Sequence, residues 1–150
     1  MERIPSVAGR LDLDFGFVLP LAFSIPRRVM PQMTDDRERA FAGKSVKLEL
    51  VEFLNPDENH VIGEEMIRRS FTKTNPAGNR AFEYLANHYP QPIVWKCQQF
   101  MLVFPGTVLL GEGNRRYVQI LDFSCGPWYI RGAWLDGIFG SRFRVVGFGK

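Results

Sequence analysis

The chain has 150 residues, of which 45% are hydrophobic and 23% are charged, and its formal net charge is +3. A chain of this length and composition forms one globular domain with its own core, which excludes a disordered polypeptide, a collagen-like repeat and a coiled coil. Its 13 phenylalanines, 14 glycines and 10 prolines favour strands and turns over long helices.

The first predicted element is an extended ribbon within residues 1–33. Every odd position from Leu11 to Ile25 is apolar, which is the two-residue period of a strand with one apolar face. Because Pro20 lacks the N–H that a central strand must donate, the segment is an edge strand, two short strands or an arm. The apolar positions, which we predict to bind a partner, are Leu11, Leu13, Phe15, Phe17, Leu19, Leu21, Phe23 and Ile25.

The length of this ribbon leaves two alternatives open. An unbroken ribbon would run about 50 Å at ~3.3 Å per residue, whereas a domain of this size is about 40 Å across. The ribbon therefore either bends between Phe17 and Pro20 into consecutive strands of its own domain, or it lies as an arm along another subunit.

Neither a membrane span nor a secretion signal is predicted. The longest apolar run, residues 15–25, contains a proline and is shorter than the about 20 residues that a span needs. Asp12 and Asp14, directly before this run, do not fit the pattern of a cleaved signal peptide. We therefore expect no membrane partner and no secretion.

Residues 34–150 are predicted to form a single α+β domain. Its first half contains three helical signals: an acid-led turn that stops at Gly43, a short helix within His60–Thr72 and a helix over Pro76–His88. A proline at the first position of the last helix fits, because that position needs no hydrogen-bond donor. A half-exposed strand over Val46–Leu50 lies between the first two signals.

The apolar positions of this strand change parity after Leu50. Val51 and Phe53 are apolar, although the alternation up to Leu50 would place them on the polar face. We interpret the change as a bulge or a twist near Leu50 and Val51, because a bulge inserts one extra residue and reverses the alternation.

From residue 92 onward the helical period disappears, and short β-rich runs alternate with turns. These runs are Ile93–Gln98, Phe100–Phe104, Thr107–Leu110, Tyr117–Phe123, Trp128–Leu135 and Arg142–Phe148. Their spacing predicts an antiparallel meander closed into a small sandwich or a curled sheet. The predicted fold class is therefore α+β, with one or two short helices and an extended N-terminal arm or edge strand.

Within this half, the run Cys125-Gly126-Pro127-Trp128-Tyr129-Ile130-Arg131-Gly132 resembles a Gly-Pro-Arg-Trp-Phe-Leu-Arg-Gly strand of an actinobacterial domain of unknown function. The resemblance is confined to residues 125–132 and implies no activity. The two cysteines of the chain, Cys97 and Cys125, are too few for a disulfide framework.

The positive charge is concentrated in the C-terminal third. Residues 94–150 carry seven cations against three carboxylates, whereas residues 34–93 carry eight against ten. A basic segment rich in aromatic rings is a candidate for nucleic-acid contact, with cations on phosphates and rings on bases. The candidate cations are Arg115, Arg116, Arg131, Arg142 and Arg144. Neighbouring residues of a strand point to opposite faces, however, which separates each arginine from the adjacent ring.

The sequence offers no catalytic or cofactor motif. His60 and His88 are far apart in the chain, and neither has a cysteine or carboxylate at metal-ligand spacing. The segment Gly111–Asn114 lacks the Gly-Lys-Ser/Thr ending of a phosphate loop and leads into a strand. We therefore expect no enzyme activity, no cofactor and no metal.

These observations favour a structural or assembly subunit of a large complex. The expected setting is a phage or virus particle (capsid, neck, tail or baseplate), in the virion or in the host cytoplasm. The ribbon would dock on other protein subunits, in a homo- or hetero-oligomer, through apolar burial and edge-strand hydrogen bonds. The alternatives are a nucleic-acid-associated β module that uses the C-terminal arginines, and an enzyme or ligand binder with a pocket that the sequence does not reveal.

Overall fold

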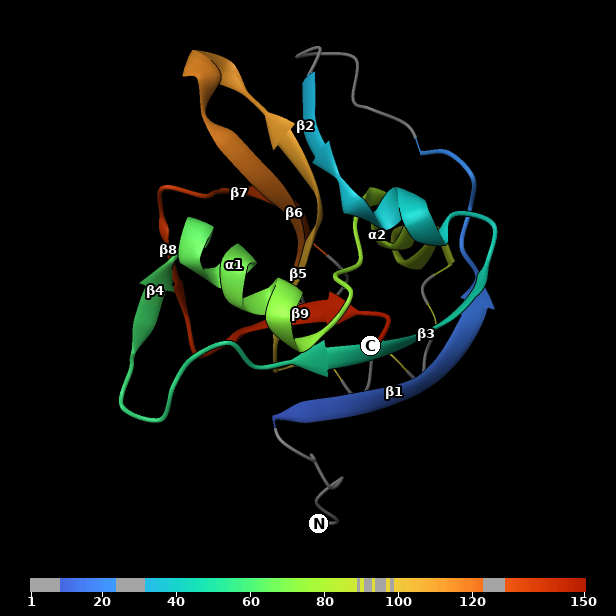
Figure 1. The fold of residues 1–150 in the computed structure, drawn as a ribbon, viewed down its shortest axis with the longest axis horizontal. Coiled ribbons are helices and arrows are strands. Elements are labelled where there is room, and N and C mark those ends of the chain that lie inside the picture. Colours follow the sequence, from blue (N-terminus) through green and yellow to red (C-terminus); the bar gives the residue numbers. More distant parts are fainter. Residues whose placement is uncertain are drawn as a thin grey trace.

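The computed structural model describes residues 9–23, 32–88, 90, 93, 97, 99–122 and 129–150. In this part of the chain, a mixed seven-stranded sheet carries a helix on each face (Figure 1). The strands of this sheet are β1 (Arg10–Val18), β2 (Gln32–Asp36), β3 (Ser45–Val51), β5 (Met101–Leu110), β6 (Arg116–Asp122), β7 (Tyr129–Trp134) and β9 (Phe143–Gly147). The helical elements are η1 (Arg37–Phe41), α1 (Gly63–Lys73), α2 (Asn79–His88) and η2 (Glu112–Asn114). A smaller sheet pairs β4 (His60–Ile62) with β8 (Ile138–Gly140).

The large sheet has the strand order β1-β3-β9-β5-β6-β7, with β2 beside the second half of β5. Its neighbours are antiparallel except β5 and β9, where Met101–Val103 runs parallel to Phe143–Val145. The predicted α+β class is confirmed, but the prediction of a purely antiparallel meander was wrong. Turn residues indicate where a strand ends but not which strand it pairs with. The sequence therefore does not reveal that the chain after β5 returns to place β9 parallel to it.

Side chains from the two faces of the sheet form two hydrophobic clusters. The cluster that we call the α2-side core includes Leu50, Phe82, Leu85, Leu102, Phe104 and Val146. The α1-side core includes Val51, Met66, Ile67, Val103, Ile120 and Val145. Successive residues of β3, β5 and β9 are thus buried on opposite faces, which gives the continuous apolar pattern of strands covered on both sides.

The same arrangement explains the change of parity after Leu50. Leu50 and Val51 each expose 1% of their surface, and they belong to different cores. The pairing of Glu49–Val51 with Val145–Gly147 runs without a register shift. The prediction of a bulge at this point was therefore wrong, and both parities are apolar because both faces of β3 are covered.

Both helices begin later than the sequence predicted. α1 starts at Gly63 because His60–Ile62 pairs with β8 as a strand. α2 starts at Asn79 because the residues before it bond to the sheet: the N–H of Ala77 donates to the carbonyl of Val146 at 2.8 Å. The periodicity of the sequence identified both helices. It placed their first residues too early, because hydrogen bonds to the two sheets hold these residues outside the helices.

β5 is a continuous strand across the predicted break at Pro105-Gly106. Its register with β6 shifts there, which accommodates a proline that has no N–H to donate. In the predicted run Ile93–Gln98, the backbones of Ile93 and Cys97 are helical, so a strand at these two positions was wrong. The other residues of that run lie outside the described part of the chain.

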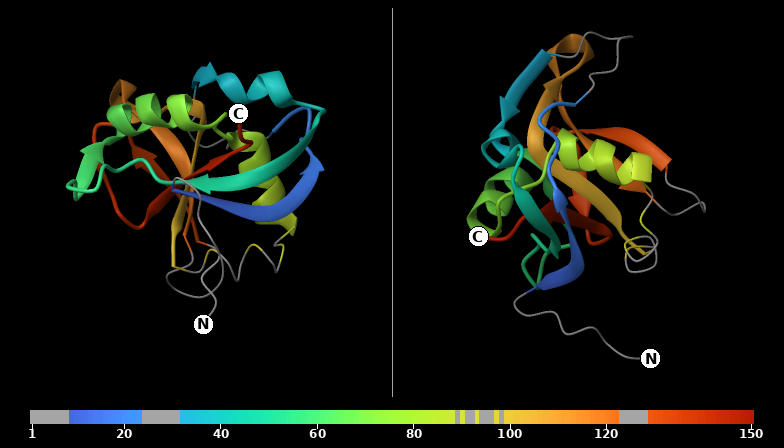
Figure 2. Two further views of the ribbon diagram at one scale, coloured as in Figure 1. Left: turned by 60° about the horizontal axis from the view of Figure 1, so that its bottom comes forward. Right: turned by 90° about the vertical axis from the view of Figure 1, so that its right-hand side faces the viewer.

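β1 contains the first half of the predicted ribbon and forms one edge of the sheet (Figure 2). It pairs antiparallel with β3, and its register shifts between Asp12 and Gly16, where Asp14 has a φ of 53°. Leu13 is fully buried in the α2-side core. The odd positions that pack partly against the same core are Leu11, Phe15 and Phe17. The strand thus curves along the chain's own sheet.

Beyond Val18 the ribbon leaves the sheet. Leu19 is again fully buried in the α2-side core, whereas Leu21 exposes 76% of its surface. Phe23 is half-buried, and Ile25 lies outside the described residues. The apolar period therefore describes a face that packs on the α2-side core up to Leu19, whereas Phe23 lies outside that core with the Arg80 guanidinium 5.0 Å from the centre of its ring.

Replacing Leu19 by alanine tests this assignment. We expect Leu19→Ala to lower the free energy of unfolding by about 2–5 kcal/mol, because it leaves a cavity in the α2-side core. The matched control Leu21→Ala should change it by less than about 0.5 kcal/mol, because that side chain is exposed. Urea denaturation measures both, and equal losses in the two variants would contradict the assignment.

Candidate functional site

The two edges of the large sheet differ in how they are protected. At β1 the register shift between Asp12 and Gly16 interrupts the edge, and the Asp12 carboxylate accepts a hydrogen bond of 2.8 Å from the N–H of Asp14. Bulges and charged side chains of this kind prevent an edge strand from pairing with another chain. The β1 edge is therefore poorly suited to strand addition.

The β7 edge has no such register shift in the described part of the chain, and the charged residue of its strand is Arg131, which lies 4.0 Å from Asp122. β7 pairs with β6 from Tyr117 opposite Trp134 to Asp122 opposite Tyr129, with no register shift. Tyr129 exposes 60% of its surface, Ile130 53% and Trp134 37%. Because neighbouring strand residues point to opposite faces, Tyr129 and Ile130 put apolar surface into solvent on both sides of the strand.

The backbone of β7 also has groups that face outward. The N–H of Leu135 donates to the carbonyl of Arg116 at 2.9 Å, in register with the β6–β7 ladder. In an antiparallel pair such bonded residues alternate with residues whose N–H and C=O point away from the neighbouring strand. The backbone groups of Ile130, Gly132 and Trp134 therefore face the outer edge, where no described strand pairs with β7.

A shallow groove with a volume of about 320 Å³ lies beside this edge, lined by Gly111, Glu112, Tyr117, Gly132 and Trp134. The rings of Tyr117 and Trp134 meet edge to face with centroids 5.6 Å apart. A Cβ added at Gly132 would lie 2.9 Å from Cδ2 of Tyr117, so the ring covers the glycine. Burial raises the pKa of the Tyr117 hydroxyl, which stays protonated at neutral pH. The groove thus offers aromatic surface with one carboxylate at its rim.

Sequence reasoning did not select Tyr129, Ile130 and Trp134 as exposed residues. β6 is largely apolar on both parities, which is the pattern of a strand covered on two faces, and in β7 only Arg131 departs from this pattern. In the structure β6 has that environment, whereas β7 is exposed along almost all of its length. Arg131 alone does not separate the two cases, because β6 also contains Arg116 and Asp122 and exposure depends on which strand lies at the edge.

Two of the candidate nucleic-acid contacts pair with carboxylates beside this region. Arg115 bonds to Asp136 at 2.7 Å, and its guanidinium lies 4.1 Å from the centre of the Trp134 ring. The hydrogen bond from Arg115 lowers the pKa of Asp136. Arg116 bonds to Glu64 at 2.6 Å. These contacts fix the arginines against their own chain and compensate their charge.

Of the remaining three candidate arginines, Arg131 lies on β7 itself, Arg144 lies on β9 and Arg142 lies just before β9. The Arg144 side chain is mostly buried and bonds to Glu52 at 3.1 Å. Arg131 lies 4.0 Å from Asp122, and Arg142 is exposed. Four of the five candidate cations thus have a carboxylate of the same chain within 4.0 Å, which leaves less charge for phosphate contacts.

A buried ionic cluster joins η1 to the start of α2. The Glu38 carboxylate is fully buried and accepts hydrogen bonds from the backbone N–H groups of Gly78, Arg80 and Ala81 at 2.5, 2.8 and 3.1 Å. The Arg80 guanidinium donates to Asp36 at 2.9 and 3.0 Å and to Glu38 at 3.2 Å. Burial raises the pKa of Glu38, and the hydrogen bonds from the helix N-terminus and Arg80 oppose this effect.

Thr107 of β5 completes this cluster with two hydrogen bonds. Thr107 donates to Asp36 at 3.1 Å, and its hydroxyl accepts the N–H of Asn79 at 3.0 Å. The side chains of Asp36 and Arg80 each expose 7%. The sequence pattern indicates only an acid-led helical turn at Asp36 and Glu38, because their partner Arg80 is far away in the chain. The cluster stabilises the junction of η1, α2 and β5 and offers no open surface to a substrate.

Removal of the buried carboxylate tests its structural role. Glu38→Ala leaves three backbone N–H groups around the start of α2 without an acceptor and should lower the free energy of unfolding by about 3–5 kcal/mol. Glu38→Gln keeps the shape and an acceptor oxygen, so we expect a smaller loss. Urea denaturation measures both variants, and an alanine variant as stable as the parent would contradict the assignment.

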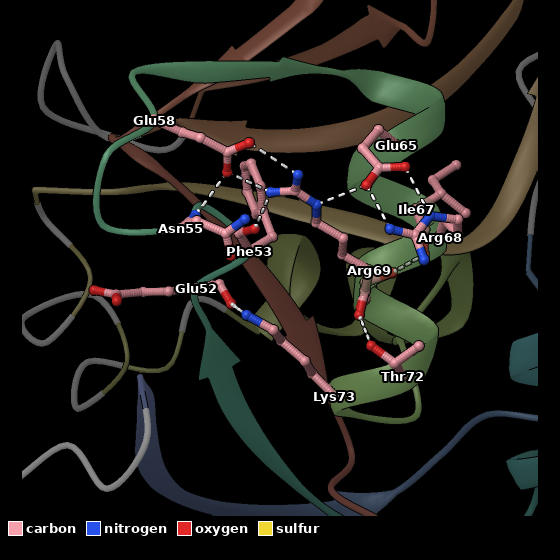
Figure 3. A network of polar contacts seen from close by, with 11 residues as sticks. Glu52, Phe53, Asn55, Glu58, Glu65, Ile67, Arg68, Arg69, Thr72 and Lys73 are labelled. Carbon is pink, nitrogen blue, oxygen red and sulfur yellow. Dashed lines mark hydrogen bonds and ion pairs between the residues drawn. The ribbon is translucent and has the colours of Figure 1, made fainter.

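A second network fixes the loop before β4 to α1 (Figure 3). Arg69 donates to Glu58 at 2.5 and 2.9 Å, to Glu65 at 2.8 Å and to the carbonyl of Phe53 at 3.0 Å. Hydrogen bonds from Arg69 lower the pKa of Glu58 to about 2, and those from Arg68 and Arg69 do the same for Glu65. Both carboxyl groups are ionised at neutral pH, so neither has a proton to donate in acid catalysis.

The acidity of Glu58 can be traced to one side chain. We expect Arg69→Gln to raise the pKa of Glu58 from about 2 toward its usual 4.5, whereas Arg68→Gln, which removes bonds to Glu65 only, should leave it unchanged. In the parent protein this interaction contributes stability above pH 4.5 and is lost as the pH falls through 2. NMR titration of the carboxyl carbons measures these values. Equal shifts in both variants would contradict the assignment.

Comparison with known proteins adds no relative: no family model, no curated protein and no solved structure matches the chain. In the described residues, no three His, Cys, Asp or Glu side chains come together as a metal site. No helix in that part of the chain is long and apolar enough to cross a membrane. The β7 edge with its groove is therefore the surface on which we base a functional assignment.

Proposed function

We propose that the protein is a subunit of a protein assembly and that it binds a neighbouring subunit by strand addition at β7. One observation carries this proposal: at the outer edge of β7, exposed Tyr129, Ile130 and Trp134 accompany backbone groups that no described strand pairs. A regular, apolar edge strand promotes aggregation unless a partner covers it.

Strand addition uses both features of the edge. A strand laid against β7 would bond to the outward N–H and C=O groups of Ile130, Gly132 and Trp134. It would also cover apolar side chains on both faces, where burial of a side chain such as Ile130 contributes about 1.5–3 kcal/mol before the costs of association and ordering. The ribbon has no docking role in this proposal, because Leu13 and Leu19 already pack inside the chain.

The setting that we propose is the one expected from the sequence, a phage or virus particle, in the virion or the host cytoplasm. The β-rich framework and the exposed edge support an assembly subunit over the two alternatives. A nucleic-acid module is less favoured because most candidate arginines have carboxylate partners in the chain. An enzyme is less favoured because the carboxylates Glu58 and Glu65 are held by arginines.

A lysine in the middle of the edge tests the proposal, since charged side chains prevent edge pairing. We expect tagged protein, sedimented from an extract of the cells that naturally produce it, to run in a complex heavier than the 17.2 kDa monomer. Ile130→Lys should shift most of it to the monomer position. Val18→Lys, at a β-branched residue that is 60% exposed on β1, should leave it in the complex.

Circular dichroism separates loss of binding from loss of fold, and Ile130→Lys should keep the parent spectrum because its side chain points into solvent. If the two lysine variants sediment alike, or if the parent protein runs as a monomer in the extract, strand addition at β7 is not how this chain functions.

A further inference from the structure

We infer that the neighbour bound by β7 is a second copy of this chain, paired antiparallel with its own β7 about a two-fold axis at Gly132. This inference rests on the proposed strand addition and specifies its partner. It follows from three properties of the edge: the spacing of its outward backbone groups, the symmetry of its side chains and the position of its charge.

The backbone spacing limits the registers that two copies can adopt. Two-fold symmetry requires that a residue i facing residue j in the second copy is matched by j facing i. Hydrogen bonds form only where outward-facing residues meet, and in β7 these are Ile130, Gly132 and Trp134. With the axis at Gly132, the glycines of the two copies face each other and Ile130 faces the partner's Trp134, so every outward group finds an acceptor or donor.

The side chains are symmetric about the same point. Ile130 and Trp134 lie on the same face as Gly132, at equal distances on either side of it. In the paired state each isoleucine lies against an indole of the other copy, and aliphatic–aromatic pairs across strands are stabilising. The groove lined by Tyr117 and Trp134 opens on this face, so the partner's Ile130 would lie at its rim.

The charge of the strand excludes the nearest alternative. An axis at Arg131 would put two guanidinium groups directly opposite each other, which is destabilising. With the axis at Gly132, each Arg131 faces the partner's Ala133 and keeps its own Asp122 at 4.0 Å. An axis at Ala133 would instead place Trp134 against the partner's Gly132 and leave Ile130 beyond the end of the partner's strand.

Disulfide cross-linking between two copies tests this register. All variants also carry Cys125→Ser, which removes a native thiol. Residues of a hydrogen-bonded antiparallel pair have Cα atoms about 5.5 Å apart, within the range that a disulfide spans. Positions 130 and 134 of one chain are about 13 Å apart, too far for an internal bridge. We therefore expect an equimolar mixture of Ile130→Cys and Trp134→Cys proteins, mildly oxidised, to form a covalent dimer of twice 17.2 kDa.

Three controls with one introduced cysteine each and a sedimentation measurement test whether a cross-link reports this register. Each of the two variants oxidised alone should stay mostly monomeric on a non-reducing gel, because its thiol lies about 13 Å from its copy. Tyr129→Cys, at a residue that is 60% exposed, should also stay monomeric, since its copy lies about 20 Å away. Sedimentation equilibrium of the purified parent protein should show a concentration-dependent dimer that Ile130→Lys abolishes.

The outcomes separate this inference from the proposed function. If the mixture does not cross-link and the purified parent stays monomeric at all concentrations, while Ile130→Lys still releases the chain from its native complex, the neighbour is a different protein and the inference is overturned. Cross-linking of Ile130→Cys alone would overturn the Gly132 register. Failure of the proposed function itself is read separately, from equal sedimentation of the two lysine variants.

Discussion

The parallel pairing of β5 with β9 determines where the other strands of the sheet can lie. Met101–Val103 bonds to Phe143–Val145 on one side, and β6 occupies the other side of the same residues. The chain between β5 and β9 therefore has to place β6 and β7 beyond β5, away from β1 and β3. β7 becomes the last strand of the sheet for this reason, and its exposed apolar face is a consequence of the topology.

Charged residues hold this topology together at two places. Glu38 and Arg80 connect η1 with the start of α2, and Arg69 connects α1 with the loop that leads to β4 through Glu58. In both cases an arginine fork meets carboxylates and backbone groups whose positions are fixed by packing, so the hydrogen bonds are satisfied inside the chain. The Glu38 cluster is buried, and the arginine-bound carboxyl groups of Glu58 and Glu65 are ionised at neutral pH, so both clusters are best explained as structural.

The two edges of the sheet differ in how well they can pair with a strand of another molecule. The β1 edge has a register shift, a left-handed Asp14 and exposed acids, and a strand with these features does not extend easily. The β7 edge is regular, Arg131 is the charged residue of its strand, and Gly132 at its centre is covered by the ring of Tyr117. An assembly built on these features would grow from one edge only, and a two-fold pairing of that edge would close after two copies.

The sequence by itself determined the mixed α+β class, the approximate positions of both helices and the extended character of residues 11–19, because the periods of 2.0 and 3.6 residues are local properties of the backbone. It also identified the apolar face of the ribbon as far as Leu19. Only the tertiary structure decided that this face packs on its own α2-side core, that β5 and β9 run parallel and that β7 lies at the edge. A strand pattern records how many faces are apolar and not what covers them, so Ile120 in β6 and Ile130 in β7 look alike until the pairing of distant strands buries one and exposes the other.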